Sequence, residues 1–502
     1  MRLTTMRTIS HSSRRATDMK TITSAICLAL ATLAAGCSLQ PVYQRPAAPV
    51  AAGYPAGPAY AAPGPAASAA TPPAAVDIDW RDFLRDARLQ RLVEIALANN
   101  RDLRVAALNV EKVQAQYRVQ RASLVPQLDA GADLAASRKP ASVSSSGKTT
   151  YAHDYSANLG VSWELDFFGR IRSLSDAALQ QYFASGYARQ AARIALISQV
   201  ADQYLTLLAD DEQLQVTKDT LDAARQTYGI MKLQFDTGTL SELDLRLSQT
   251  TLEQAQISYS AQLRTRAQAE NALVLLIGQN LPADLPPAAT LEQQSLLSDI
   301  PAGLPSDLLR QRPDILQAES ALRAENANIG AARAAFFPTI SLTGSAGSMS
   351  STLGGLFATG SGAWSFAPSV SLPIFSGGAN QANLDAARVQ KSIAVAQYEK
   401  AIQAAFKEVA DGLAARGTYD DQLAAQQRFA SAQQRRLELA QLMYDNGADS
   451  YLNVLTAHTD LYNARQSLIT ARLGRLTNLV DLYRALGGGW HAQQMQYAQE
   501  QP

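Results

Sequence analysis

Two similar helix-to-helix turns, 209 positions apart, are the feature that most constrains how this chain can fold. The first turn is centred on Gly238 and the second on Gly447, and the same offset relates Leu252 to Leu461. A chain of 502 residues would ordinarily contain several domains. A long internal repeat instead predicts one architecture that is used twice.

Each repeat is predicted to contain a helix, two alternating strands, a very long helix, a tight turn and a second long helix. The glycine of each turn suits the left-handed conformation that often follows a helix C-terminus. Ser241 and Ser450 stand where a helix N-cap is expected. The first repeat is assigned to residues 101–280 and the second to residues 313–489, and a proline-rich linker at 281–312 joins them.

The beginning of the chain has the pattern of a bacterial lipoprotein signal. An apolar run within residues 1–36 ends directly before Cys37. We therefore expect residues 1–36 to be removed and Cys37 to carry covalent lipid such as palmitate. The alternative is an ordinary signal peptide with an incidental cysteine. Residues 37–100 then form a lipid-anchored linker and equatorial region, and Ser38, which is not an inner-membrane retention aspartate, favours the outer membrane.

Four segments switch from helical periodicity to alternation of apolar and polar residues. They are residues 127–137, 155–167, 339–349 and 364–375. Each is long enough to cross a bilayer at a tilt, and this alternation is typical of outer-membrane barrels. A soluble, half-buried sheet would alternate in the same way. Because lysine is almost absent from the polar face and aromatic residues gather near the strand ends, we favour the barrel.

Four strands are too few to close a barrel, and an open sheet edge is not tolerated in lipid. The smallest barrels of this kind have about eight strands, so the barrel is predicted to be shared between chains. Two copies would give eight strands and a plugged lumen, whereas three would give twelve strands and an open one. Closed cyclic symmetry is the usual way for identical chains to meet this need.

Proline-free stretches favour very long helices, because an interior proline would break a helix. These helices are predicted at residues 170–235 and 240–278, and again at 376–445 and 450–486. Apolar residues recur within them at intervals of three and four, as in coiled coils. A soluble coiled-coil spacer would show the same pattern, but beside the strands a helical tube that projects from a barrel is favoured. Residues 490–502 form a polar tail.

Composition and motif content argue against several function classes. The chain has 44 basic and 44 acidic residues, so there is no electrostatic case for nucleic-acid binding. Glu164 and Asp166 share one strand face and could act as paired catalytic carboxylates, but we interpret them as pore-facing barrel acids. The four histidines are scattered without metal-ligand spacing, and no phosphate-binding loop is present. We predict no enzyme activity, no metal and no cofactor beyond the lipid.

Several motifs resemble those of the TolC-like outer-membrane efflux channels, in particular their lipoprotein branch. The matching stretches are CSLQPVYQRP from Cys37, WELDFFGR from Trp163, RPDI from Arg312, LPIF from Leu372 and LYRALGGGW from Leu482. The resemblance implies a homotrimer with a twelve-stranded barrel, a periplasmic α-helical barrel and an equatorial belt. It also implies a periplasmic adaptor and an inner-membrane RND-type pump as partners, and export of drugs or other small molecules. The alternative is the outer-membrane channel of a type I protein secretion system.

The two turns are the expected periplasmic tips of the tube, where it contacts the adaptor and narrows. The tip residues are Asp236, Thr237, Gly238, Asp445, Asn446 and Gly447. The candidate gate residues are Asp244, Arg246, Asp449, Thr456 and Thr459. In many relatives the last two positions are an Asp and an Arg. With threonine at both, we expect Arg246 to pair with an acid from a neighbouring helix, and the alternative is a solvated arginine that is paired locally.

Overall fold

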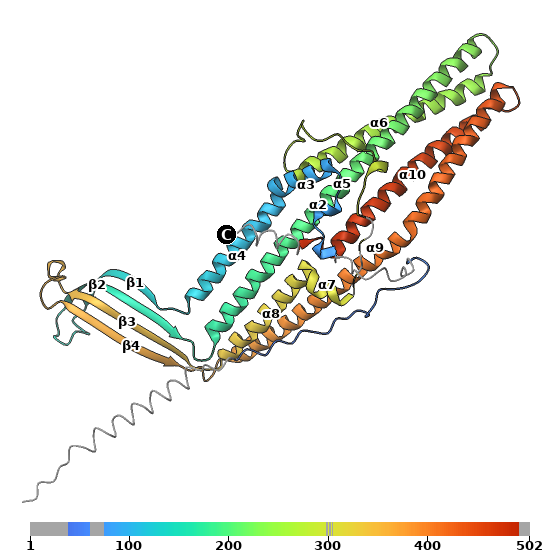
Figure 1. Cartoon of the computed structure of the whole chain (residues 1–502). Helices are drawn as coiled ribbons and strands as arrows, with labels where there is room; N and C mark the ends of the chain where they lie inside the picture. Colours follow the sequence, from blue (N-terminus) through green and yellow to red (C-terminus); the bar gives the residue numbers. More distant parts are fainter. Residues whose placement is uncertain (1–38, 61–74, 298–299, 301–302, 304, 491–502) are drawn as a thin grey trace, which may run out of the picture. The chain divides into compact units, whose positions relative to one another are not determined.

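The structure is a computed structural model that describes residues 39–60, 75–297, 300, 303 and 305–490. Within these residues, helices predominate and the strands form one sheet (Figure 1). The chain divides into two compact units. The sheet unit combines the residues up to Arg45 with 111–183 and 320–396, and the helical unit combines 46–110, 184–319 and the residues from 397 onward.

The sheet consists of four antiparallel strands in the order β1-β2-β3-β4. They are β1 (Gln127–Lys139), β2 (Thr150–Leu165), β3 (Thr339–Ser350) and β4 (Gly362–Ser371). The pairing of β2 with β3 runs from Leu165 opposite Ile340 to Tyr155 opposite Ser350. Backbone hydrogen bonds therefore join the two repeats, and β1 and β4 remain as the sheet edges.

All four predicted strands are present, but their ends differ from the prediction. The strand expected at 155–167 begins earlier, at Thr150, and ends at Leu165. The ladder uses backbone groups, so it continues through the polar residues that precede position 155. The strand expected at 364–375 ends at Ser371. Pro373 has no N–H with which to continue the ladder. The strands expected at 127–137 and 339–349 extend slightly further, to Lys139 and Ser350.

Both edge strands leave apolar side chains uncovered. Every residue of β1 and β4 is exposed in the single chain. Leu128 is 71% exposed and Trp364 is 80% exposed. A sheet edge also presents unpaired N–H and C=O groups that can pair with another strand. The sheet unit is therefore incomplete as a single chain, because its edges and its apolar side chains lack partners.

The sheet unit also contains segments of four helices. They belong to α4 (Arg101–Ala122), α5 (Arg170–Asp236), α8 (Pro313–Ala334) and α9 (Ala379–Asp445). Phe168 follows β2, Phe337 precedes β3, and their rings stack with centroids 4.9 Å apart. Ala177, Ala324 and Ala327 form a small buried cluster between α5 and α8. The junction that follows β2 in the first repeat thus packs against the junction that precedes β3 in the second repeat.

The first described residues form an extended strap along α8. Arg333 Nη1 donates a hydrogen bond to the Leu39 carbonyl at 3.1 Å, and Asn326 Nδ2 donates to the Pro41 carbonyl at 2.7 Å. As residue numbers rise along the strap, they fall along α8, so the two segments are antiparallel. The start of the strap therefore lies beside the end of α8, only a few residues before β3 begins.

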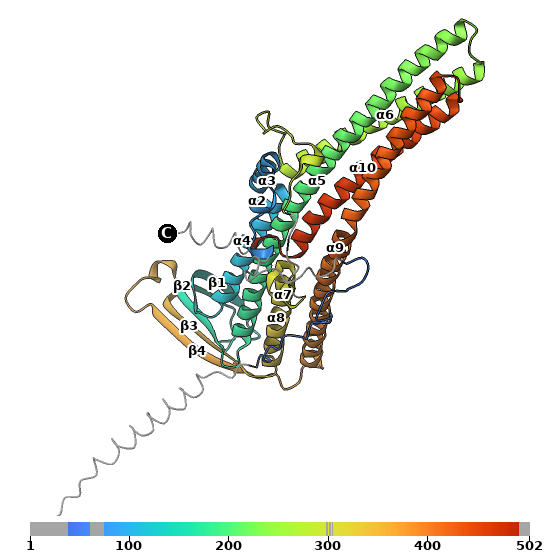
Figure 2. The same cartoon turned by 45° about the vertical axis from the view of Figure 1, so that its right-hand side comes forward.

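The helical unit contains two long hairpins. One hairpin is formed by α5 and α6 (Glu242–Ile277), the other by α9 and α10 (Tyr451–Ala485), and their tips lie on the same side in both views (Figures 1 and 2). α5 and α9 have 67 residues each, which corresponds to about 100 Å. The hairpins adjoin a compact core in which the rings of Phe83, from α2 (Trp80–Phe83), and Tyr483 stack at 4.2 Å.

The predicted ends of the long helices agree with the structure to within three residues. The largest difference is at α9, which was expected from residue 376 but begins at Ala379. Gly377 and Gly378 there have φ values of +59° and +85°. These left-handed conformations suit glycine and cannot belong to a right-handed helix. No helix within the described ranges is both long and apolar enough to span a membrane.

Two predicted connecting segments are more ordered than expected. Residues 281–312 include the short helix α7 (Pro305–Gln311). Residues 37–100 contain α3 (Ala87–Asn99), where apolar residues recur at helical spacing. Trp490, which we assigned to the polar tail, is buried with Val76 and Ile194. Apolar packing explains this correction, because an indole ring gains free energy when it leaves water. The remainder of the predicted tail lies outside the described residues.

The predicted fold class is confirmed at the level of one chain. The chain is mixed α and β, each repeat contributes two strands and two long helices, and the strands form a single four-stranded sheet.

Candidate functional site

The first tip turn, between α5 and α6, is closed by backbone and side-chain hydrogen bonds. Gly238 has φ of +78°. Its N–H donates to the Phe235 carbonyl and the Thr239 N–H donates to the Gln234 carbonyl, both at 2.9 Å, which is the Schellman arrangement. Ser241 is the N-cap of α6, since its hydroxyl accepts from the Asp244 N–H at 3.1 Å. The predicted glycine conformation and N-cap are both confirmed here.

The second tip turn, between α9 and α10, has the same backbone but a different cap. Gly447 has φ of +69°, and the Ala448 N–H donates to the Met443 carbonyl at 2.9 Å. The prediction for Ser450 is only half right, because it occupies the N-cap position but its side chain makes no capping bond. Asp449 takes over part of that role. Its Oδ1 accepts from the Ser450 N–H and from Asn453 Nδ2, both at 2.7 Å.

An apolar cluster joins the two tips, and the sequence alone did not reveal it. Its buried members are Met231 of α5, Leu245 of α6, and Tyr451 and Val454 of α10. Tyr444 of α9 packs against the cluster, and its ring meets that of Tyr451 at 5.6 Å, edge to face. The repeat offset predicted that the turns are equivalent, but it gave no information on their contact.

Most candidate gate residues use their polar groups locally in the single chain. Arg246 Nη2 lies 3.3 Å from Glu242 Oε1 on the same helix, and its Nη1 donates to Gln249. Both members of the ion pair are well exposed. Thr456 and Thr459 donate to the carbonyls one turn earlier on their own helix. This is the local pairing given above as the alternative, and in the single chain Arg246 is paired within its own helix. Pairing with an acid from a neighbouring helix in an assembly stays a prediction.

The two predicted barrel acids bind the beginning of α5. Arg170 donates to both carboxylate oxygens of Glu164, at 2.9 and 2.7 Å. Asp166 lies just beyond the end of β2 and accepts from the backbone N–H groups of Ile171 and Arg172 at 3.1 and 2.8 Å. Carboxylates are favourable at a helix N-terminus. Within the chain both acids therefore fix the strand-to-helix junction, a role that sequence reasoning missed.

The polar face of the β3–β4 strand pair carries pairs of serine hydroxyls. Ser341 Oγ lies 2.7 Å from Ser369 Oγ, and Ser345 Oγ lies 2.8 Å from Ser365 Oγ. Such cross-strand pairs stabilise an antiparallel sheet. They also leave a polar and uncharged strip, as predicted from the alternation.

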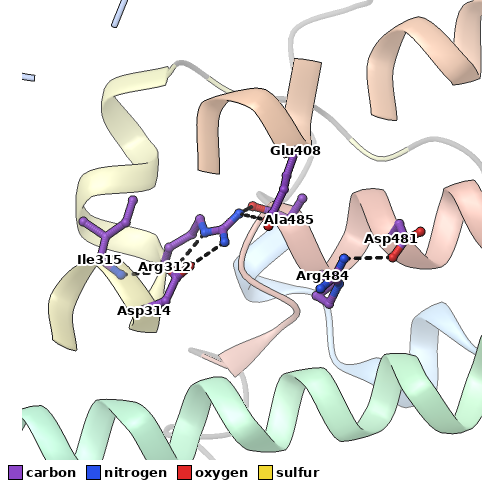
Figure 3. Close-up of polar contacts among 7 residues, drawn as sticks. All are labelled: Arg312, Asp314, Ile315, Glu408, Asp481, Arg484 and Ala485. Atoms are coloured by element: carbon purple, nitrogen blue, oxygen red, sulfur yellow. Dashed lines mark hydrogen bonds and ion pairs between the residues drawn. The ribbon is translucent and has the colours of Figure 1, made fainter. Parts of the chain in front are cut away.

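A buried arginine ties three helices together in the helical unit (Figure 3). Arg312, at the start of α8, binds both carboxylate oxygens of Asp314, at 3.0 and 2.5 Å. Its Nη1 also donates to Glu408 of α9 at 2.8 Å and to the Ala485 carbonyl at the end of α10 at 2.9 Å. The sequence analysis placed this arginine in the RPDI motif but predicted no partner for it. The signal available was an arginine directly before a helix-opening proline.

Two predicted chemical features have no test in the structure. Among the residues that are described, no group of His, Cys, Asp and Glu is arranged to hold a metal ion. Cys37, the predicted lipidation site, lies outside the described residues.

Comparison with known proteins identifies relatives along almost the whole chain. The family model for "Outer membrane efflux protein" matches residues 92–279 and 304–488, so that each repeat carries one match. The toluene efflux pump outer membrane protein TtgC of Pseudomonas putida is 48% identical over 466 residues, which cover 93% of this chain and 95% of TtgC. The outer membrane protein OprJ of Pseudomonas aeruginosa is 45% identical over 469 residues, with 93% and 95% covered.

A solved structure gives the same result at the level of the fold. The open state of the MtrE outer membrane channel of Neisseria gonorrhoeae is 41% identical and superposes with a TM-score of 0.79, covering 90% of this chain and 99% of MtrE. The resemblance that the motifs indicated is thereby confirmed. The chain belongs to the outer membrane efflux protein family.

Proposed function

We propose that three copies of this chain form the outer-membrane exit channel of a tripartite efflux pump. The observation that carries the proposal is the incomplete sheet, whose edges β1 and β4 are fully exposed together with their apolar side chains. In lipid every backbone polar group needs a partner, so only a closed barrel is stable there. Three copies would supply twelve strands, enough for an open lumen.

In this proposal the helical hairpins form a periplasmic tube that continues from the barrel. Their tips would meet a periplasmic adaptor, which connects the channel to an inner-membrane RND-type pump. Exposed apolar side chains near the tips favour such a contact, since Leu243 is 70% exposed and Leu452 is 55% exposed. Large exposed apolar groups on a polar surface mark interaction sites. The channel itself would be a passive conduit without enzyme activity.

The names of the relatives favour small molecules over proteins as the cargo. TtgC is described as belonging to a toluene efflux pump, and another relative, SrpC, to a solvent efflux pump. These descriptions concern those proteins, but they support efflux over the alternative of a type I protein secretion channel.

We also propose that Cys37 carries lipid that anchors the mature chain in the outer membrane. The strap supports this position, because Leu39 is bonded to Arg333 near the end of α8 and just before β3. A lipid two residues before Leu39 would then lie near the membrane-facing end of the sheet unit. Two anchors, the lipid and the barrel, would act on the same chain.

Deletion of the gene tests the cargo assignment. We expect the deletion strain to become more susceptible to drugs and organic solvents, while its profile of secreted proteins stays unchanged. A strain that loses a secreted protein and keeps its drug susceptibility would support the type I secretion channel instead.

A further inference from the structure

A groove of about 500 Å³ lies between the two hairpins of the helical unit. It adjoins the cluster that joins the tips, because Leu455 lines the groove and also packs against that cluster. Its twelve lining residues come from α5, α6 and α10. They include Thr217 and Thr220 of α5, Thr251 and Ser258 of α6, and His458 of α10. This volume falls in the range that holds small organic ligands in proteins.

The lining has no charged side chain, although the whole chain carries 44 basic and 44 acidic residues. Its threonines use their hydroxyl donors on their own helices. Thr217 donates to the Gln213 carbonyl at 2.7 Å, and Thr220 donates to the Val216 carbonyl at 2.8 Å. Thr251 does the same toward Leu247. The threonines therefore offer methyl groups and oxygen lone pairs to the groove, but no free donor.

His458 is one of several uncharged polar side chains in the groove, beside Gln254, Ser258, Tyr462 and Asn463. It is partly buried, and within the described residues it forms no hydrogen bond. Burial lowers the pKa of His458, so the imidazole is neutral near pH 7. A neutral imidazole has one N–H donor and one nitrogen acceptor. The groove thus combines methyl and methylene surface with uncharged polar groups, among which the imidazole can accept a hydrogen bond.

A charged ligand is disfavoured here, because it would lose hydration without meeting an opposite charge. A pure hydrocarbon would leave the imidazole unbonded. A ligand with an apolar ring and one donor satisfies both requirements. We propose that the groove binds small, uncharged aromatic molecules that carry a hydroxyl group, such as alkylphenols. The ring would lie against Leu455 and the threonine methyl groups, and the hydroxyl would donate to His458.

The proposal rests on the proposed function only for the source of the ligand, because phenols would then be cargo in transit. The binding site itself follows from the lining. Occupancy in a conduit must be weak and reversible, since a site that holds its ligand tightly would obstruct passage.

Cysteine protection tests the site on the purified full-length protein. Ser258→Cys places a thiol in the groove, and Ser260→Cys places a matched thiol on an exposed face of the same helix. The rate of N-ethylmaleimide modification is measured on each peptide by mass spectrometry, with and without 4-ethylphenol. We expect 4-ethylphenol to slow modification at position 258 by about tenfold at saturation and to leave position 260 unchanged. Equal slowing at both positions, or none at either, would overturn the proposal. So would a thiol at 258 that never reacts.

Ligand and side-chain variants test the chemistry. In the Ser258→Cys protein, ethylbenzene should protect several-fold less than 4-ethylphenol at equal concentration, and 4-ethylbenzoate should not protect. Adding His458→Phe, which keeps the ring bulk, should reduce 4-ethylphenol to the level of ethylbenzene. Unchanged discrimination in that variant would contradict the role of His458. A variant that does not assemble is recognised by its loss of heat-modifiable migration, and His458→Gln then replaces it.

The same preparation separates this proposal from the proposed function. If the protein conducts in planar bilayers but position 258 is not protected, the groove proposal fails and the channel stands. If position 258 is protected but the protein does not conduct, the site stands and the channel assignment fails.

Discussion

At the scale of single residues, a buried arginine of the helical unit, Arg312, forms two ion pairs, and the sequence analysis did not assign it to a functional site. Arg312 is only 9% exposed at its side chain, whereas its partners Asp314 and Glu408 are about 40% exposed. Water can therefore solvate the two carboxylates if the arginine is removed, but the Ala485 carbonyl loses a buried donor. An unsatisfied buried acceptor costs about 1–3 kcal/mol.

The first prediction follows from that contact. Arg312→Met should destabilise the junction of α8, α9 and α10 by about 2 kcal/mol and should speed hydrogen exchange in the peptide that contains Ala485. The matched control is Arg310→Met, an exposed arginine of α7, whose effect should stay below about 0.5 kcal/mol. Equal exchange in both variants would show that the arginine does not hold the end of α10.

The second prediction concerns the gate. The Arg246–Glu242 pair within α6 is exposed, so it contributes below about 1 kcal/mol. Stability therefore gives no reason for Arg246 to be at the tip. We expect Arg246→Glu to raise single-channel conductance and to sensitise cells to vancomycin, because three added acids would repel one another around the closed end. Trimer assembly should be unaffected.

A matched control is available for this substitution. Lys407→Glu also reverses an exposed base that pairs with an acid four residues away, Asp411. It lies far from the tips in the sequence, so its conductance should match wild type. If Arg246→Glu also conducts like wild type, the constriction lies elsewhere, and Thr456 and Thr459 become the next residues to substitute.

At the scale of helices and turns, the tip geometry depends on two glycines with positive φ. Gly238 and Gly447 have open space where a Cβ would lie, so a substitution there costs backbone strain without any clash. For a residue other than glycine the left-handed conformation costs about 1–2 kcal/mol.

The third prediction compares a glycine that needs the left-handed conformation with a glycine inside a helix. Gly447→Ala should destabilise the α9–α10 turn by about 1 kcal/mol and increase hydrogen exchange at the tip. Gly229→Ala, at a helical glycine that also has free space, should instead stabilise α5 by about 0.5–1 kcal/mol. If both substitutions changed stability in the same direction, the left-handed conformation would not be the reason for glycine at the tip.

The sequence predicted the elements well where one physical pattern controls them. Alternation located all four strands, and the lack of proline located the long helices to within three residues. Strand ends were less predictable, as at Thr150, because ladder bonding continues through polar residues. Contacts between distant segments could not be predicted at all. The tip cluster around Met231 and the bonds of Arg312 depend on which helices become neighbours, and periodicity does not encode that.

Among the candidate site residues, local features were predictable and long-range partners were not. The turn glycines and the Ser241 cap were predictable because they depend on local backbone geometry. Glu164 and Asp166 were located correctly on one face, but their partners in α5 were not anticipated, since alternation describes a side chain's face and not its partner. The Ser450 side-chain cap was predicted wrongly, and Asp449, the preceding residue, instead accepts from the Ser450 N–H and the Asn453 side chain.

At the scale of the whole molecule, the fourth prediction concerns membrane attachment. Labelled palmitate should be incorporated into the wild-type protein and not into Cys37→Ser. We expect Cys37→Ser to retain part of its efflux function when it is exported by a cleavable signal, because the barrel itself would span the membrane. Equal labelling of both proteins would refute lipidation at this residue, and a complete loss of the exported channel would show that the barrel cannot anchor without lipid.

The fifth prediction concerns closure of the sheet between chains. A single chain exposes both sheet edges. The proposed channel must therefore form from an assembly, because a monomer cannot close the barrel. The most direct measurement is single-channel conductance of the purified full-length protein in planar bilayers, with trimer and monomer fractions compared. We predict discrete conductance steps from the heat-modifiable trimer and none from the monomer. A stable trimer that inserts into the bilayer and never conducts would contradict the proposed exit channel.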